Sequence, residues 1–243
     1  MMFNNKTVFI TGVNRGLGKH IFERYLKEGA SLICTVRKKD IKFSKYLKKI
    51  KKKFNNKIKV LYFDLENRNQ IINNLSKLKK KNLTIDILVN NAGCASGSIL
   101  EMTDIDNIEK TFKINYFSQL LIIQKLLPFL KKSKNASIIN IVSISGFLDH
   151  RGTIAYGSSK AALAFATKVM ANEFLTYKIR VNAIAPSAIN TGMLKKMDIG
   201  SKNQLLKDTN LKKPLMVSSI IKKILFLSSK DSINFNGKII KKF

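Results

Sequence analysis

The sequence predicts a single α/β domain in which a parallel β-sheet is covered by helices on both faces. Short apolar segments of strand length alternate with segments of helix length along the chain, and this alternation is typical of parallel sheets. A glycine-containing turn follows the first apolar segment, as in a strand–turn–helix unit. The 243 residues contain no proline-, glycine- or serine-rich linker, so we expect one domain over residues 1–243.

The expected elements can be placed from the apolar pattern. The strand candidates cover residues 6–10, 31–36, 57–63, 85–90, 136–142 and 179–184, and a terminal strand is expected near 238–240. One helix is expected from the glycine turn to about Glu28, and another over residues 217–227. The lysine-rich segment 38–59 carries apolar residues at helical spacing, which indicates a helix with a solvated outer face.

The chain is strongly basic, with 45 lysine and arginine residues against 15 acidic ones and a formal net charge of +30. A charge of this size attracts polyanions such as nucleic acid, anionic lipid or an acidic carrier protein. Most of the charge comes from lysine, which occurs together with many asparagines and isoleucines. The codon bias of an AT-rich genome produces the same composition, so both explanations of the charge remain open.

The cysteines and the lengths of the apolar runs indicate a cytoplasmic protein. Cys34 and Cys94 lack the spacing of a disulfide framework or a metal site, so we expect neither. The apolar stretch near the N-terminus is too short for a signal peptide. Other apolar runs fall short of the roughly 20 residues that span a bilayer, so no membrane span is expected.

Three glycines in the first strand-to-helix turn predict a dinucleotide site. Gly12, Gly16 and Gly18 follow the first strand candidate directly and precede an amphipathic helix pattern. Glycines let the backbone approach a pyrophosphate closely, and the N–H groups and dipole of the helix attract its charge. A tight structural turn is the alternative, but the position within a β-α-β unit favours a dinucleotide.

The end of the second strand indicates which dinucleotide is preferred. Sites that prefer NAD place an acid there, about 20 residues beyond the glycines, to bind the ribose 2′-hydroxyl. This chain has Arg37 at that position and Arg15 within the glycine turn, while Asp40 lies further on among lysines and is expected at the surface. Two guanidinium groups can hold a 2′-phosphate, so the sequence predicts NADP(H) in preference to NAD(H).

Tyr156 and Lys160 are four residues apart in a helix-forming segment, so their side chains lie on one face of the helix. A cation about 4 Å from a tyrosine hydroxyl is able to lower its pKa from about 10 by about three units. Lys160 is therefore expected to make Tyr156 a proton donor or acceptor near neutral pH. Ser143, at the end of the strand candidate 136–142, is placed to hydrogen-bond a substrate carbonyl. Taken alone, this spacing is common, and an exposed helix pair would be the better explanation of the tyrosine and the lysine.

Taken together, these motifs resemble the short-chain dehydrogenase/reductase family. The segment TGVNRGLG at 11–18, Asp64, the turn NNAG at 90–93, Asn115, Ser143 and the segment YGSSK at 156–160 follow one another in the order and spacing of that family. The resemblance extends from Lys6 to about Lys238. It implies a Rossmann-type, doubly wound sheet, usually of seven strands, and hydride transfer between a nicotinamide and a carbonyl or alcohol carbon.

The resemblance implies a role for each of the four residues expected in catalysis. Tyr156 would be the general acid in reduction, and Ser143 would polarise and orient the carbonyl. Lys160 would lower the pKa of Tyr156 and bind the ribose of the nicotinamide. Asn115 would hold a water molecule in a proton relay to Lys160. The cofactor half is expected at about 1–115, and the catalytic and substrate half at about 116–243.

The resemblance also implies the contacts to the cofactor. Asp64 would contact the adenine, Asn90 and Gly93 would line the adenosine side, and Thr191 would hold the carboxamide. The full set of expected cofactor-binding residues is Gly12, Asn14, Arg15, Gly16, Leu17, Gly18, Arg37, Asp64, Leu65, Asn91, Ala92, Gly93, Tyr156, Lys160, Pro186, Ile189 and Thr191. Without the resemblance, a structural turn at Asn90 and a capping role for Thr191 would explain those residues as well.

Within the family, the chain is most similar to 3-oxoacyl-[acyl-carrier-protein] reductases. This likeness implies carbonyl reduction in fatty acid biosynthesis, with an acidic acyl carrier protein as partner. Sugar, polyol and other secondary-alcohol dehydrogenases share the same motifs and are the alternative. A non-catalytic NADP-binding subunit or a binding protein with a basic face is a further alternative. Specific nucleic-acid binding is not expected, because the basic segments lack interleaved aromatic residues.

The substrate pocket is expected between residues 144–154 and the loop at 188–210, which is expected to close over the substrate. His150 lies near the pocket mouth and is expected to be a solvent-exposed loop histidine, with a role in orienting the substrate as the alternative. The resemblance implies a homodimer or homotetramer formed through the helices near 111–131 and 155–176. The C-terminal sequence FNGKIIKKF differs from the Asp-Gly-Gly of many relatives, so the tetramer contact and the C-terminal side of the substrate pocket are expected to differ from theirs.

Overall fold

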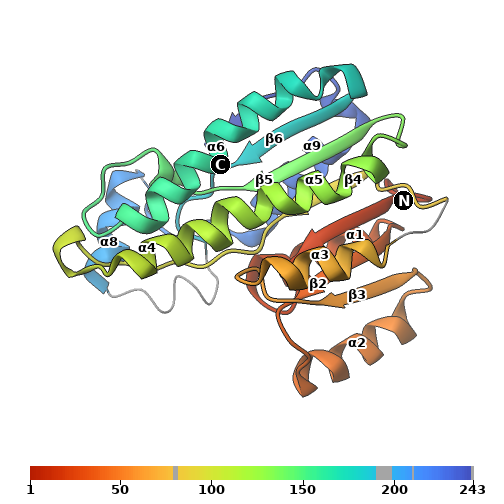
Figure 1. Cartoon of the computed structure of the whole chain (residues 1–243), viewed down its shortest axis with the longest axis horizontal. Coiled ribbons are helices and arrows are strands. Elements are labelled where there is room, and N and C mark those ends of the chain that lie inside the picture. Colours follow the sequence, from red (N-terminus) through yellow and green to blue (C-terminus); the bar gives the residue numbers. More distant parts are fainter. Residues whose placement is uncertain (79–81, 190–198, 210, 242–243) are drawn as a thin grey trace.

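A sheet of seven parallel strands forms the centre of the computed structural model, which describes residues 1–78, 82–189, 199–209 and 211–241 (Figure 1). The strand order is β3-β2-β1-β4-β5-β6-β7. The strands are β1 (Thr7–Thr11), β2 (Ser31–Val36), β3 (Ile58–Tyr62), β4 (Ile87–Asn90), β5 (Ala136–Ile141), β6 (Ile179–Ile184) and β7 (Ile239–Ile240). The predicted Rossmann-type α/β fold is confirmed, and every expected strand is observed within about two residues of its expected ends.

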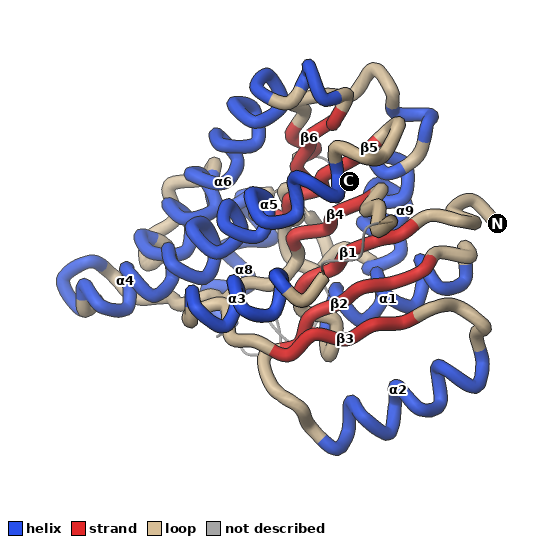
Figure 2. Tube along the Cα trace, turned by 45° about the vertical axis from the view of Figure 1, so that its right-hand side comes forward, coloured by secondary structure: helices blue, strands red, loops and turns tan. Residues whose placement is uncertain are grey.

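Helices cover both faces of the sheet (Figure 2). They are α1 (Gly16–Lys27), α2 (Ile41–Lys53), α3 (Arg68–Ser76), α4 (Ile105–Phe112), α5 (Ser118–Leu130), α6 (Ile154–Glu173), α8 (Ile199–Asp208) and α9 (Val217–Ser228). A π-helical turn, Lys113–Phe117, joins α4 to α5, and a 3-10 turn, Ile144–Gly146, follows β5. Among the described helices, none is long and apolar enough to cross a membrane.

The alternation of side chains along the strands divides the core into two layers. In β1, Val8 and Ile10 pack in the layer formed with α1, α2 and α9, whereas Phe9 packs in the layer formed with α3, α5 and α6. The central strands are apolar on both faces, as expected for a parallel sheet covered by helices. Full burial of each such side chain contributes about 1.5–3 kcal/mol, so both layers stabilise the sheet that positions the site.

The lysine-rich helix α2 packs one face against the sheet. Phe43 and Ile50 are buried on its inner side, while its lysines lie outside. Asp40 accepts a hydrogen bond from the backbone N–H of Phe43 at 2.6 Å and so caps the N-terminus of α2. Asp40 was expected as a surface residue, and the structure gives it this capping role.

The strand order reverses between β1 and β4, since β1 pairs with β2 on one side and with β4 on the other. In open parallel sheets, ligands bind beyond the carboxyl ends of the strands at such a reversal. The glycine turn follows β1, the NNAG turn follows β4, and Ser143 follows β5. All three therefore lie at the same edge of the sheet.

Candidate active site

The glycine turn between β1 and α1 permits a close approach to the backbone. Gly12 has a φ angle of 71° and Gly16 one of 56°, in the left-handed region that favours glycine. A Cβ atom on Gly18 would lie 2.0 Å from the carbonyl oxygen of Gly12, so α1 packs against the strand end only with glycine there. At Gly16, no described atom lies within 4 Å of the position that a Cβ would occupy, so the backbone borders open space.

The N-terminus of α1 faces this turn. Its N-cap residue is Arg15, whose side chain makes no capping hydrogen bond to the described residues, and the first turn contains no acidic side chain. Unpaired N–H groups and the helix dipole favour an anion at this position. Asn14 and Arg15 are exposed beside the turn, whereas Leu17 is buried in the core. The turn therefore fits the pyrophosphate of a dinucleotide, with any contact from Leu17 made through its backbone.

Asn91 connects the NNAG turn to the glycine turn. Its Nδ2 atom donates to the carbonyl oxygens of Thr11 at 2.9 Å and of Gly12 at 3.1 Å. The hydroxyl of Thr11 accepts from the backbone N–H groups of Asn91 and Ala92, both at 2.9 Å. These four bonds fix the two turns relative to each other.

Asn90 lies within the sheet rather than beside the adenosine. Its side chain is buried and donates from Nδ2 to Oδ1 of Asn140 at 2.9 Å. Asn140 donates in turn to the hydroxyl of Thr167 on α6, also at 2.9 Å. The prediction that Asn90 lines the adenosine side is wrong for its side chain, because that side chain is bonded inside the core.

Arg37 and Asp64 meet beyond the ends of β2 and β3. Nε of Arg37 lies 3.9 Å from Oδ2 of Asp64, and the Arg37 side chain is 71% exposed. Oδ1 of Asp64 accepts from the backbone N–H of Glu66 at 3.0 Å, which orients the carboxylate. Leu65, between the two acids, is buried in the core. The exposed guanidinium of Arg37 is thus open to an anion from solvent.

Ser143 and Tyr156 are brought together by the segment that connects β5 to α6. Ser143 lies close enough to Tyr156 to lower the pKa of the tyrosine hydroxyl, and Oγ of Ser143 accepts from the N–H of Ser145 at 3.2 Å. Lys160 lies one helical turn after Tyr156 and is buried, with Nζ 5.9 Å from the centroid of the tyrosine ring. Nζ donates to the carbonyl oxygen of Ile141 at 2.9 Å. The structure therefore gathers the serine, the tyrosine and the lysine into one cluster.

Asn115 lies in the π-helical turn and is fully buried. Its Oδ1 accepts from the N–H of Cys94, and its Nδ2 donates to the carbonyl oxygen of Cys94, both at 2.9 Å. Nδ2 also donates to the hydroxyl of Ser159 at 3.0 Å, and Ser159 donates to the carbonyl oxygen of Tyr156 at 2.7 Å. Asn115 therefore links the NNAG turn to the helix that carries Tyr156. Ser159 was missed from the sequence, because a serine within a helical run gives no signal of its partner.

Comparison with known proteins decides the family. A family model described as short chain dehydrogenase matches residues 6–201. The chain belongs to this family. The 3-oxoacyl-[acyl-carrier-protein] reductase FabG of Buchnera aphidicola is 30% identical over 242 residues, which cover 99% of this chain and 96% of that protein. FabG of Thermotoga maritima is 30% identical over 240 residues, which cover 99% and 97%.

A solved structure supports the same assignment. The structure described as the Pseudomonas aeruginosa RhlG/NADP active-site complex has a TM-score of 0.85 and 26% identity, covering 99% of this chain and 97% of that chain. As a short-chain dehydrogenase/reductase, the chain is an oxidoreductase that acts on CH–OH groups. Members of the family bind nicotinamide cofactors, which agrees with the fit of the glycine turn.

Gly93 belongs to the NNAG turn and lies against the side chains of Asn115 and Lys160. A Cβ atom on Gly93 would lie 2.9 Å from Oδ1 of Asn115 and 3.3 Å from Nζ of Lys160. A larger residue would therefore press on both side chains. With glycine, the NNAG turn lies directly against the cluster.

The pKa values in the cluster differ from the expectation for Tyr156. Burial raises the pKa of Tyr156, although its hydrogen bond with Ser143 acts in the opposite direction. Burial also lowers the pKa of Lys160 to about 8. The prediction that Lys160 brings the pKa of Tyr156 toward neutrality is wrong for this geometry, because Nζ is bonded to the carbonyl of Ile141 rather than to the tyrosine hydroxyl.

The remaining predicted positions follow β6. Pro186 is buried, and its carbonyl oxygen accepts from the N–H of Ile144 at 2.9 Å. Ile189 is half-buried and forms a bridge with Leu215. Thr191 lies outside the described residues, as does the rest of 190–198 in the expected substrate loop.

Proposed function

We propose that this short-chain dehydrogenase/reductase uses NADPH to reduce a 3-oxoacyl thioester, carried on an acyl carrier protein, to the 3-hydroxyacyl thioester. The observation that carries the proposal is the cluster of Ser143, Tyr156 and Lys160 next to a glycine turn that fits a dinucleotide. The 30% identity to two FabG proteins over nearly the whole chain supports the acyl-carrier substrate. The net charge of +30 supports an acidic carrier as partner.

The residues that would hold the cofactor lie along one edge of the sheet. The glycine turn and the N-terminus of α1 would bind the pyrophosphate, and Asp64 would contact the adenosine. Arg15 and Arg37 are both exposed at this edge and would bind a 2′-phosphate. Lys160 would donate to the ribose next to the nicotinamide. The bound nicotinamide supplies the hydride for the reduction.

Tyr156 would supply the proton that the carbonyl oxygen gains during reduction. Because burial raises its pKa, Tyr156 carries its proton throughout the neutral range and is ready to donate it. Ser143, which lies beside Tyr156, would donate to the same carbonyl oxygen and stabilise the negative charge that develops there. Both groups come from the segment that follows β5, so their spacing is fixed by the sheet and by α6.

Lys160 and Asn115 would support this proton transfer from within the protein. The ammonium group of Lys160 has three N–H donors, and one of them is bonded to the carbonyl of Ile141. The other donors would serve the ribose and the return of a proton to Tyr156. Asn115 holds α6 through Ser159. The water relay implied for Asn115 by the family resemblance remains a proposal.

Copies of the chain are proposed to pair through α5 and α6. Phe117 in the π-helical turn is 59% exposed, and Phe165 and Val169 on α6 are 70% and 39% exposed. Large apolar side chains grouped on an open surface are typical of protein interfaces. These residues support the homodimer or homotetramer that the family implies.

A comparison of substrates tests the proposed function. We expect kcat/KM for acetoacetyl-acyl carrier protein to exceed that for the same acyl group on a small thiol, because the basic protein surface recruits the acidic carrier. Ketose sugars are expected to react more slowly than either thioester. Turnover of sugar ketones without turnover of thioesters would contradict the acyl-carrier assignment.

Arg37→Ala is expected to weaken NADPH binding by about tenfold and NADH binding by less than about threefold. The reason is that the guanidinium would contact only the 2′-phosphate, which NADH lacks. Titration of both cofactors by fluorescence measures the two dissociation constants. Equal losses for NADPH and NADH would show that Arg37 does not bind the 2′-phosphate.

The pH dependence of kcat/KM for NADPH is expected to follow Lys160, whose pKa is lowered to about 8. Below this pH Lys160 is protonated and donates to the ribose, and above it the positive charge and one N–H donor are lost, which weakens the contact. The value of kcat/KM should therefore fall as pH rises through about 8, since this parameter reports groups of the free enzyme.

Lys160→Arg provides the control for this profile, because a guanidinium stays protonated throughout the range. The variant is expected to be less active, but without the fall near pH 8. A wild-type profile that is flat through pH 8, or a fall that persists in Lys160→Arg, would assign the pH dependence to another group.

A further inference from the structure

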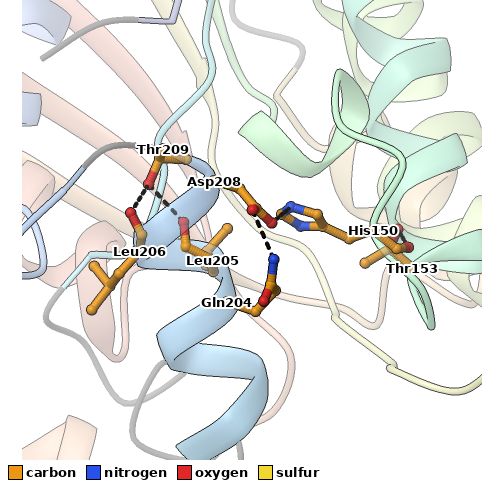
Figure 3. A network of polar contacts seen from close by, with 7 residues as sticks. All are labelled: His150, Thr153, Gln204, Leu205, Leu206, Asp208 and Thr209. Atoms are coloured by element: carbon orange, nitrogen blue, oxygen red, sulfur yellow. Dashed lines mark hydrogen bonds and ion pairs between the residues drawn. The ribbon is translucent and has the colours of Figure 1, made fainter.

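His150 is not the exposed loop histidine that the sequence predicted. Its side chain is 16% exposed, and Nε2 forms an ion pair with Oδ2 of Asp208 (Figure 3). His150 belongs to the loop that connects β5 to α6, whereas Asp208 is the last residue of α8. The ion pair therefore joins two segments that lie far apart in the sequence.

Both partners are oriented by further hydrogen bonds. Nε2 of Gln204, one turn earlier in α8, donates to Oδ1 of Asp208 at 2.8 Å and leaves Oδ2 for His150. The carbonyl oxygen of His150 accepts from the hydroxyl of Thr153 at 2.7 Å and from its N–H at 3.3 Å. These bonds orient the carboxylate of Asp208 and fix the backbone of His150, from which the imidazole reaches that carboxylate.

Asp208 occupies an unfavourable position for an acid. The C-terminal end of a helix carries partial negative charge, so a carboxylate there is repelled unless a cation neutralises it. His150 in its protonated form brings that positive charge. The hydroxyl of Thr209 donates to the carbonyl oxygen of Leu205 at 2.7 Å, which gives one of the carbonyl groups at this helix end a hydrogen-bond partner. A residue that is locally unfavourable but specifically paired is typical of a functional position.

A small apolar cluster also brings α8 close to the segment that follows β5. Leu205 is buried against Ala188, and Leu206 and Ile144 pack against this small cluster. Ile144 directly follows Ser143 in the chain. Helix α8 therefore meets the segment between Ser143 and Tyr156 at His150, and it shares a small apolar cluster with Ile144 near the start of that segment.

We propose that the His150–Asp208 ion pair fixes α8 against the segment that carries Ser143 and Tyr156, and that His150 and Asp208 are positioning residues for the carbonyl substrate. This inference rests on the proposed function, since it assigns α8 as the wall of the substrate site. With the ion pair intact, α8 is ordered before the substrate arrives. Without it, α8 is in place in only a fraction of the molecules. The apparent affinity for the substrate is then reduced in proportion to that fraction.

Asp208→Asn and His150→Gln are the variants that test the ion pair, because each removes one charge and keeps a similar shape. Each is expected to raise KM for the carbonyl substrate about five- to tenfold, with kcat at saturation within about twofold of wild type. The dissociation constant for NADPH should stay unchanged, since the pair lies away from the glycine turn. Asp231→Asn, a change at an exposed acid outside the site, is the matched control and should alter neither constant.

The charge-exchanged double variant, His150→Asp with Asp208→His, separates positioning from general stability. It restores the pair in the opposite orientation and is expected to bring KM back to within about threefold of wild type. Unchanged KM in both single variants would overturn the proposal. A fall in kcat that parallels a fall in melting temperature, or a double variant worse than either single one, would overturn it as well.

Hydrogen exchange provides a readout that does not depend on turnover. The backbone amides of residues 204–208 are expected to exchange at least about fivefold faster in Asp208→Asn than in wild type and in Asp231→Asn. If the wild type reduces no carbonyl substrate, the proposed function fails while this measurement still decides whether the ion pair holds α8. Equal exchange in all three proteins would show that it does not.

Discussion

Tyr156→Phe is expected to lower kcat for carbonyl reduction by about a hundredfold or more. The substitution removes the hydroxyl that would protonate the carbonyl oxygen and keeps the ring that packs beside Lys160. The dissociation constant for NADPH should change by less than about threefold, because the glycine turn is untouched. Steady-state kinetics combined with cofactor titration measures both effects.

Tyr177→Phe is the matched control, because Tyr177 lies beyond the far end of α6 and outside the cluster. It should retain full activity. A Tyr156→Phe enzyme with wild-type kcat would remove the tyrosine from the mechanism and assign the proton transfer to another group.

Gly18→Ala is expected to abolish tight NADPH binding and to lower the free energy of unfolding by about 1–3 kcal/mol. A Cβ atom at this position would lie 2.0 Å from the carbonyl oxygen of Gly12 and 2.4 Å from Nδ2 of Asn91, so the turn itself must shift. In the interior of an ordinary helix, glycine to alanine raises the free energy of unfolding by about 1 kcal/mol. The effect predicted for Gly18→Ala therefore has the opposite sign to the one that helix propensity alone would give. Chemical denaturation and cofactor titration give the two quantities.

Gly97→Ala is the control for this substitution, because a Cβ there would only approach the carbonyl oxygen of Gly152, at 3.8 Å. It is expected to leave stability and cofactor binding nearly unchanged. If Gly18→Ala binds NADPH as tightly as Gly97→Ala does, the close packing of α1 against the glycine turn does not shape the cofactor site.

The fold could be predicted from the sequence because parallel strands buried on both faces are continuous apolar runs. The segment 31–36, for example, coincides with β2. The cluster of Ser143, Tyr156 and Lys160 could be predicted because its residues stand at the end of a strand and at helical spacing. Elements with a strong local pattern can therefore be predicted without knowledge of tertiary contacts.

The features that escaped prediction depend on contacts between distant segments. The π-helical turn that holds Asn115 has no residue pattern of its own, and the partners of Asn115 come from Cys94 and Ser159. The position of His150 depends on Asp208 in another helix. The raised pKa of Tyr156 results from burial, which spacing along a helix does not reveal. In each case the deciding quantity is tertiary packing rather than local sequence.

The consumption of NADPH after addition of an acetoacetyl thioester tests the central claim most directly. The account predicts that wild-type protein consumes one NADPH for each 3-hydroxyacyl thioester formed, and that this turnover disappears in Tyr156→Phe. Tight binding of NADPH without turnover of thioesters or any other carbonyl compound would contradict it.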